Sequence, residues 1–221
     1  MKRIFLCTRS SFQRWRISTK IHLVILAAGV FAWWILGDVS RYCGYLNIKA
    51  APWILPHYLQ MPLLQVLFGI FTTVLYSDAP FIDEAAQFLL IRTGKRVYFI
   101  GQLLYLLLSS FIWSIYWFLI TLLPFWNKLE FNPTWGDFLT LMSTQSGTSN
   151  AGAYGLSLSF YCEPRLNKIL PGWQATLIAW FLLWMCAFFI GVLVFTLNLI
   201  SKANAGILAA GLVFHKRDLY G

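Results

Sequence analysis

Four long runs of apolar residues, separated by shorter polar stretches, dominate the chain. They cover residues 21–37, 53–76, 97–123 and 173–200. A helix needs about 20 apolar residues to cross the hydrocarbon core of a bilayer, and about 17 is the lower limit. Because lipid offers no hydrogen-bond partners to the backbone, each run is expected to be helical. The pattern predicts an all-α, polytopic transmembrane helix bundle that crosses the membrane at least four times.

The second run differs from the others because prolines and amides interrupt it. Pro56 and Pro62 each remove a backbone hydrogen bond, and such breaks survive in a membrane only where protein or water satisfies the freed groups. The expected spans contain three candidates for intramembrane polar contacts, namely Gln60, Gln65 and Gln102. These amides could line a substrate path. Amides in membrane helices more often bond a neighbouring helix, and we expect that role.

Composition supports the membrane interpretation. Hydrophobic residues make up 59% of the 221 positions and charged residues 11%, against about 25% charged residues in soluble domains. A soluble protein of this length could not cover so much apolar side chain, whereas lipid solvates it directly. The formal net charge of +9 is therefore better explained by membrane topology than by nucleic-acid binding.

The N-terminal segment 1–20 is both basic and apolar. It carries six lysines and arginines among apolar residues such as Phe5 and Trp15. This mixture favours a cytosolic amphipathic arm on an anionic membrane surface. A basic flank that only orients the first span is the alternative, and the two roles are compatible. We expect the arm to be retained and to precede a single transmembrane domain over 21–221.

Charge asymmetry predicts the orientation of the spans. With a cytosolic N-terminus, the inner segments are 1–20, 77–97 and 201–203, and the outer segments are 38–52 and 124–173. The inner segments hold ten lysines and arginines in 44 residues, and the outer segments hold five in 65. The density of basic residues is about threefold higher inside, as the positive-inside rule requires. The N-terminus is therefore predicted to be cytosolic.

The main polar interruption lies between the second and third spans. Ser77 and Pro80 are typical of a helix start, and acidic residues precede basic ones. We expect a short cytosolic helix over 78–96. Its charged candidates for a partner contact are Asp83, Glu84, Arg92, Lys95 and Arg96. Without further information, the same charges also fit a solvated loop whose basic end follows the topology rule.

Two later segments are less regular. Within 124–173, a short interfacial helix is predicted over 135–142, and 143–155 is rich in small and polar residues that suit an irregular or re-entrant loop. After the fourth span, the apolar piece 205–214 rises only about 15 Å as a helix, half of the hydrocarbon core. We expect this partial fifth segment to be an interfacial helix or the beginning of another span.

The chain lacks the motifs of common membrane enzymes and ATPases. It contains no Walker A, H-E-x-x-H or G-x-S-x-G sequence. All Asp and Glu residues fall outside the expected spans, which argues against a proton-coupled carrier. No Cys or His spacing fits a metal site, so we expect no catalysis, metal or cofactor. Cys43 and Cys162 fall on the same outer face, and whether they form a disulfide stays open.

Short motifs cluster around the second and third spans. They are Tyr76-Ser-Asp-Ala-Pro-Phe-Ile-Asp83, Gln87, Arg92-Thr-Gly-Lys-Arg96, Gly101-Gln102, Trp135-Gly136 with Thr140-Leu141, and Asn198 with Gly206. Together they resemble the type-2 ABC exporter permeases, particularly small bacterial ones, and in layout the resemblance covers most of 1–214. Members of that family usually have six spans, so the resemblance implies a permease shortened at its C-terminal end.

The resemblance implies a multi-pass permease subunit in a bacterial cytoplasmic membrane, exporting an unknown substrate. It implies two protein partners, a separate ABC ATPase subunit that hydrolyses ATP and a second permease chain. The five charged residues from Asp83 to Arg96 would then contact the ATPase. The alternative function is a non-transporting membrane interaction protein, such as a bacteriocin-immunity or accessory factor. An intramembrane enzyme fits less well because the expected spans lack polar catalytic groups.

Overall fold

The structure of the chain, a computed structural model, describes residues 2–15, 18–78 and 94–218. Within them every regular element is helical, apart from an isolated parallel bridge between Ala50 and Leu129. The all-α prediction is therefore confirmed. In chain order the elements are α1 (Lys2–Trp15), α2 (Thr19–Tyr45), α3 (Leu55–Leu59), α4 (Pro62–Tyr76), α6 (Lys95–Leu122), η1 (Leu123–Lys128), α7 (Gly136–Met142), α8 (Gln145–Ser149), η2 (Asn150–Tyr154), α9 (Pro164–Ile169) and α10 (Gly172–Asp218).

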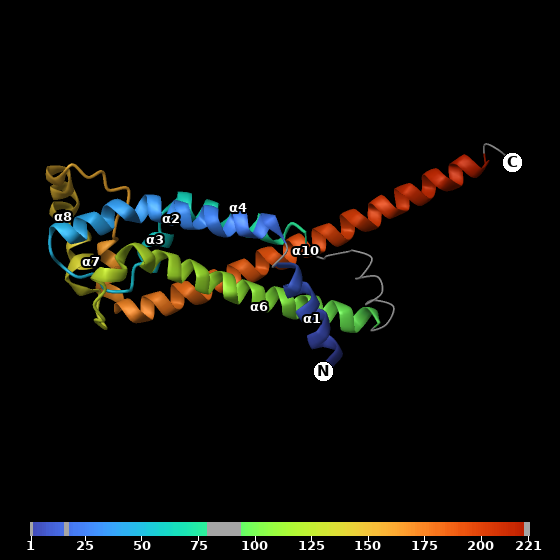
Figure 1. The fold of residues 1–221 in the computed structure, drawn as a ribbon, viewed down its shortest axis with the longest axis horizontal. Helices are drawn as coiled ribbons and strands as arrows, with labels where there is room; N and C mark the ends of the chain where they lie inside the picture. Colours follow the sequence, from blue (N-terminus) through green and yellow to red (C-terminus); the bar gives the residue numbers. More distant parts are fainter. Residues whose placement is uncertain (1, 16–17, 79–93, 219–221) are drawn as a thin grey trace.

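Three helices are long and apolar enough to cross a membrane. These segments are Thr19–Tyr45, Arg96–Lys128 and Gly172–Ser201, and Figure 1 draws the helices that contain them along one common direction. They match the first, third and fourth predicted spans. Large apolar side chains on their outer faces, such as Trp34 and Leu182, are more than 60% exposed. A bilayer provides the apolar surroundings that such a surface needs.

The second predicted span is not one helix. The run 53–76 is divided into α3 and α4, with a break at Gln60 and Met61. Pro62 begins α4, where a proline without an N–H group is tolerated. With 15 residues, α4 rises about 22 Å, less than the roughly 30 Å of the hydrocarbon core. The break that the prolines predicted is therefore confirmed, and α4 alone is not among the helices long enough to cross a membrane.

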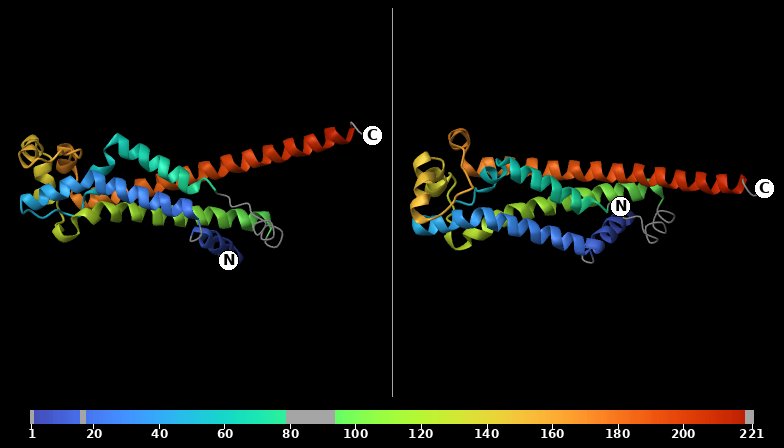
Figure 2. Two further views of the ribbon diagram at one scale, coloured as in Figure 1. Left: turned by 45° about the horizontal axis from the view of Figure 1, so that its top comes forward. Right: turned by 90° about the horizontal axis from the view of Figure 1, so that it is seen from above.

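The partial fifth segment is not a separate element. Residues 205–214 belong to α10, which continues for 47 residues from Gly172 to Asp218. No proline interrupts the chain after Pro171, so nothing in the sequence forces the fourth helix to end near Lys202. A helix of this length extends about 70 Å. Figures 1 and 2 show its C-terminal part projecting past the bundle.

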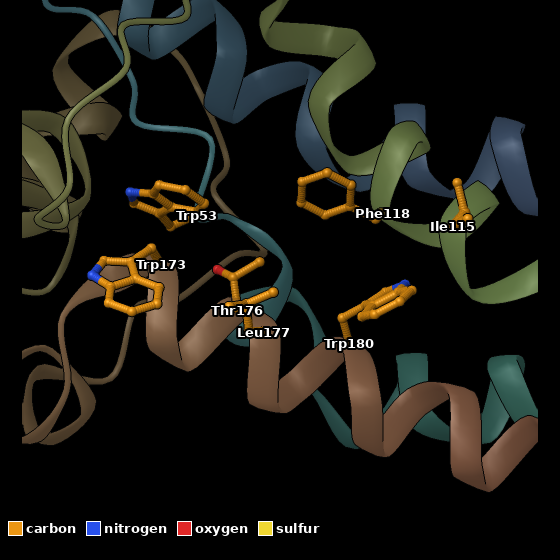
Figure 3. A pocket seen from close by; sticks show the side chains of 7 residues that line it. All are labelled: Trp53, Ile115, Phe118, Trp173, Thr176, Leu177 and Trp180. Carbon is orange, nitrogen blue, oxygen red and sulfur yellow. The ribbon is translucent and has the colours of Figure 1, made fainter. Parts of the chain in front are cut away.

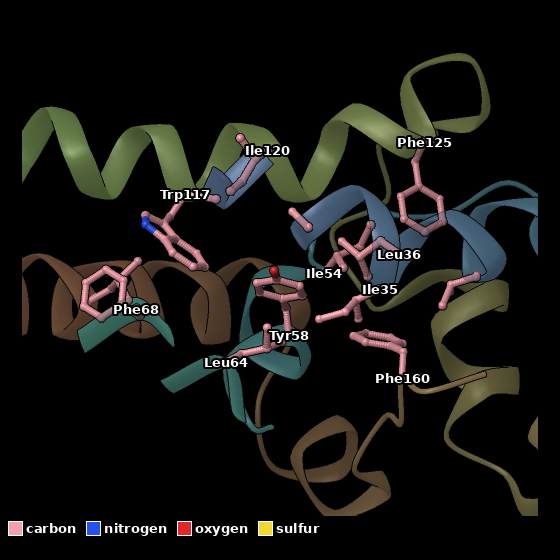
Figure 4. Close-up of a cluster of buried hydrophobic side chains, with 14 of the residues drawn as sticks. Ile35, Leu36, Ile54, Tyr58, Leu64, Phe68, Trp117, Ile120, Phe125 and Phe160 are labelled. Carbon is pink, nitrogen blue, oxygen red and sulfur yellow. The ribbon is translucent and has the colours of Figure 1, made fainter. Parts of the chain in front are cut away.

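The core lies where α2, α3, α4 and α6 come together beside α10 (Figure 4). Trp117 of α6 is buried at its centre, with its ring 5.3 Å from that of Phe68 and 6.1 Å from that of Tyr58. The Phe68–Trp117 contact is edge-to-face, and such a contact adds about 0.5–1.5 kcal/mol to the burial of the rings. Aromatic packing thus fixes the broken second run against the third span.

Short helices form a cap over one end of the bundle (Figure 2). We call it the cap end, and the opposite end, near α1, the arm end. Helix α7 confirms the short helix predicted over 135–142, and 143–155 contains the short turns α8 and η2. The Tyr42 hydroxyl of α2 donates to the carbonyl of Gly147 at 2.8 Å. This bond ties the cap to the end of the first span.

Candidate functional site

At the arm end, polar contacts join the long helices α2 and α10 to the end of α4. The Lys20 ammonium at the start of α2 lies 2.8 Å from the Asp78 carboxylate just after α4. The Asn198 amide of α10 donates to the carbonyl of Ser77 at 2.9 Å. Ser77 and Asp78 directly precede the segment 79–93, and Gly94 follows it. Asp78, the last described residue before this segment, is therefore bonded to α2, and Ser77 is bonded to α10.

Helix α1 adds a further contact at the arm end by packing across α6. A Cβ atom on Gly101 would lie 2.8 Å from the Cβ atom of Cys7, so the two helices approach closely only because residue 101 is glycine. The Thr8 hydroxyl donates to the carbonyl of Gly101 at 3.0 Å. The Trp15 indole donates to the hydroxyl of Tyr105. The predicted N-terminal arm is thus a helix that is bonded to the third span.

Gln102 takes part in the same contact. Its side chain is buried, and its Nε2 atom donates to the Ser11 hydroxyl of α1 at 3.2 Å. Its Oε1 atom has no hydrogen-bond partner among the described residues. This geometry agrees with the expectation that amides in the spans bond neighbouring helices.

Most of the predicted partner contact lies outside the described residues. This applies to Asp83, Glu84 and Arg92, and so to most of the helix predicted over 78–96. Lys95 and Arg96 are described and belong to the first turn of α6, so the prediction that they close the preceding helix was wrong. Gly94 has a φ of 83°, a conformation that favours glycine, and α6 begins directly after it. Arg96 is exposed.

Gln60 and Gln65 lie at the break between α3 and α4 and are exposed. The Gln65 amide donates to the carbonyl of Leu59 at 2.8 Å, which satisfies one backbone group freed by the break. Gln60 Oε1 lies 3.4 Å from Nδ1 of His57, a long contact. Both glutamines line a groove of about 390 Å³ between α3–α4 and α10. Unlike Gln102, they face outwards.

His57 is a central residue of the cap end that the sequence did not reveal. It is fully buried; its Nε2 atom lies 3.1 Å from Asn167 Oδ1, and its ring lies 4.6 Å from that of Trp135. Burial lowers the pKa of His57, against smaller raising effects from hydrogen bonds to Gln60 and Asn167 and from the charge of Glu163. A neutral imidazole suits this role as a buried connection between α3, α7 and α9.

Cys43 and Cys162 are free thiols and both are buried. The Cys43 thiol donates to the carbonyl of Ile48 at 2.9 Å. Burial raises the pKa of the Cys162 thiol. Thiols of this kind behave as small apolar residues, and the disulfide that the sequence left open is not formed in the structure.

A second groove, of about 360 Å³, lies on the other flank of α10 (Figure 3). It opens between α10 and α6, and its residues include Trp53, Phe118 and Trp180. The only polar side-chain oxygen at this groove, on Thr176, donates to the carbonyl of Gly172 in its own helix. This groove therefore offers packing surface without directional recognition.

No group of three or more His, Cys, Asp or Glu side chains suitable for a metal ion occurs in the residues that the structure describes. Comparisons with protein-family models, with curated proteins and with solved structures found no match for this chain. The geometry identifies an all-α protein with three helices that could cross a bilayer. Polar contacts between its helices occur at the arm end, at the cap end and along the bundle, where Trp113 of α6 donates to the Thr72 hydroxyl of α4.

Proposed function

We propose that this chain is the transmembrane permease subunit of an ATP-driven ABC transporter. ATP hydrolysis would take place on a separate ATPase chain, and a second permease chain would complete the transport path. The observation that carries the proposal is the linkage at the arm end. The described residues that flank 79–93 are bonded to, or continuous with, all the long helices, and the sequence around them resembles the exporter permeases.

A permease without a nucleotide site must receive mechanical work through an element that acts on several spans at once. Ser77 ends α4 and is bonded to α10 through Asn198. Asp78 is paired with Lys20 of α2, and Gly94 leads into α6, which carries α1. A force applied to 79–93 by a partner would therefore reach α2, α4, α6 and α10 together.

The Lys20–Asp78 pair and the Asn198–Ser77 hydrogen bond contribute little free energy, as suits contacts that break and re-form during a transport cycle. In the Lys20–Asp78 pair, 61% and 44% of the two side chains are exposed, and such pairs contribute about 0–1 kcal/mol. The Asn198–Ser77 hydrogen bond contributes about 1 kcal/mol. Links of this size position the helices at rest and can break without unfolding the protein.

The experiment is a charge reversal next to the arm end. The tagged chain is purified from its native cells in mild detergent, and the preparation is tested for a stoichiometric subunit with a Walker A motif and for ATP hydrolysis. Changing Arg92 and Arg96 together to Glu should reduce both by about tenfold or more, because a docking contact would lose two charge pairs. Membrane insertion and expression should stay near wild-type levels.

A matched control makes the same charge change at the opposite end of the bundle. Arg165 and Lys168 are exposed residues of α9, and reversing both to Glu should leave the ATPase association intact. Because both double variants alter the distribution of basic residues, their topology is checked in parallel. If no nucleotide-binding subunit accompanies the wild-type chain, the permease proposal fails and a non-transporting interaction protein is favoured.

A further inference from the structure

The outward-facing amides of Gln60 and Gln65 lie at a depth where lipid surrounds the protein. Counting back from Ser77 at the arm end of α4, Gln65 lies about 18 Å along the helix axis, and Gln60 lies beyond the start of α4, in the break before Pro62. With Ser77 at the arm-side edge of a hydrocarbon core of about 30 Å, Gln65 and the adjoining break lie in the cap-side half of the membrane. An exposed amide without a partner at this depth costs several kcal/mol. The N–H groups that remain free after the contacts with Leu59 and His57 therefore favour a polar occupant.

The groove beside Gln60 and Gln65 matches an amphiphile, because it has a polar part and an apolar part. It encloses about 390 Å³, within the range of small-molecule sites in proteins. The two glutamines lie towards its cap-side part. Because α4 and α10 both run from the cap end towards the arm end, Phe68 and Cys186 lie deeper. The exposed Leu182 lies on its rim. The groove is thus polar near the membrane edge and apolar further in.

The two glutamines keep N–H donors without a partner among the described residues, besides the Oε1 acceptor of Gln65. The Gln60 Oε1 atom faces His57 Nδ1, while its Nε2 atom has no partner among the described residues. The Gln65 Nε2 atom uses one N–H group on the carbonyl of Leu59 and retains a second. Such a site matches a ligand that brings acceptors. The ester carbonyls of a glycerolipid are acceptors, and they occur at this depth of a bilayer, directly above the acyl chains.

We propose that this groove binds one acyl chain of a glycerolipid from the cap-side leaflet. The lipid ester carbonyl accepts hydrogen bonds from the amides of Gln60 and Gln65, and the chain runs along α10 past Phe68 towards Cys186. The inference does not depend on the ATPase partner, because it concerns binding to the chain itself.

The test compares two lipids that differ only at the carbonyl. The full-length chain is purified in detergent and titrated with dioleoyl phosphatidylglycerol or with its dialkyl ether analogue, and bound lipid is counted by native mass spectrometry. The wild-type chain should bind one ester lipid about three- to tenfold more tightly than the ether lipid, as expected for one or two hydrogen bonds. Changing Gln60 and Gln65 together to Leu should abolish this preference.

A steric variant with a matched control locates the site. Cys186→Trp fills the deep part of the groove and should weaken binding of both lipids by tenfold or more. Ile178→Trp places the same ring at an exposed position of α10 outside the groove and should change nothing. Circular dichroism and size-exclusion chromatography verify the fold of each variant, and the wild-type comparison of the two lipids needs no variant at all.

Three results would overturn the proposal. The first is equal affinity of the wild-type chain for the ester and the ether lipid. The second is an ester preference that survives the double Gln→Leu change. The third is a wild-type dimer that excludes lipid and becomes monomeric in Cys186→Trp, which would show that a second copy of the chain occupies the groove.

Discussion

The two ends of the bundle are held together in different ways. At the cap end, buried aromatic side chains and hydrogen bonds connect α2, α3, α7 and α9, with His57 and Trp135 at the centre. At the arm end, an exposed ion pair connects α4 to α2 and an amide hydrogen bond connects it to α10, whereas the buried Tyr76 connects it to Ser109 of α6. Buried packing costs several kcal/mol to disrupt, whereas exposed polar links cost about 1 kcal/mol or less. The cap end is therefore suited to anchor the helices, whereas the links of α4 to α2 and α10 at the arm end are suited to break and re-form.

The strongest test of this difference removes the central ring of the cap. Trp135 is buried, and its indole donates to the carbonyl of Leu170 at 2.8 Å. Trp135→Ala should lower the free energy of unfolding by about 3–5 kcal/mol, because it leaves a large cavity and an unpaired carbonyl. Thermal unfolding in detergent measures the change. Trp126→Ala, at a side chain that is 78% exposed, should cost less than about 0.5 kcal/mol. Equal losses would show that the cap is not an anchor.

The next largest effect on stability is expected at Gly101, where α1 packs closely against α6. Gly101→Leu places side-chain atoms where Cys7 already lies, so α1 must move away from α6 at a cost of about 1–3 kcal/mol. Trypsin should then cleave α1 at the exposed Arg9 several times faster. The control Gly69→Ala has open space around the new Cβ atom and should stabilise α4 by up to about 1 kcal/mol. Unchanged cleavage in Gly101→Leu would mean that α1 does not depend on this contact.

The buried imidazole of His57, at the cap end, predicts that the stability of the protein depends on pH. Burial lowers the pKa of His57 in the folded chain. As the pH falls through about 6.5, the imidazole of the unfolded chain therefore becomes protonated, whereas that of the folded chain stays neutral to a lower pH. The contribution of His57 to stability is therefore present above pH 6.5 and is lost as the pH falls below that value. Melting temperatures from pH 8 to pH 5 should fall more steeply in the wild-type chain than in His57→Gln. Parallel curves would contradict the neutral, buried state of His57.

The smallest effect is expected at the arm-end ion pair. A double-mutant cycle with Lys20→Ala and Asp78→Ala should give a coupling free energy of about 0.2–1 kcal/mol, and this value should decrease in 0.5 M salt because screening weakens exposed pairs. Lys49 and Glu130, which form a similarly exposed pair near the cap end at 3.6 Å, provide the matched control. A coupling above about 2 kcal/mol for Lys20 and Asp78 would mean that the arm end is as firmly fixed as the cap.

The sequence predicted features that depend on local composition. Run length identified three spans, and Pro56 and Pro62 marked the region in which the second run breaks. The short helix α7 was also predicted, because Asn132-Pro133 ends the preceding segment before an apolar stretch. These signals act over a few residues, so they can be read without knowledge of the tertiary structure.

Features that depend on distant contacts were not predicted. His57 and Asn167 are separated by 110 positions, and nothing near either residue indicates the other. The close approach of α1 to Gly101 likewise joins residues far apart in the chain. The continuation of α10 past Lys202 was missed because a charged residue near the membrane edge suggested a loop, although charge alone does not end a helix. The positive φ of Gly94, directly before α6, was likewise not predicted.

The central claim, that the two ends of the bundle lie on opposite sides of a membrane with the arm end in the cytosol, is tested most directly by cysteine labelling. In a background without the four native cysteines, Thr148→Cys near the cap end and Thr93→Cys next to the arm end are each treated with a membrane-impermeant maleimide in intact cells. The account predicts labelling of Thr148→Cys alone, with Thr93→Cys labelled only after permeabilisation. Labelling of Thr93→Cys but not Thr148→Cys in intact cells would contradict it.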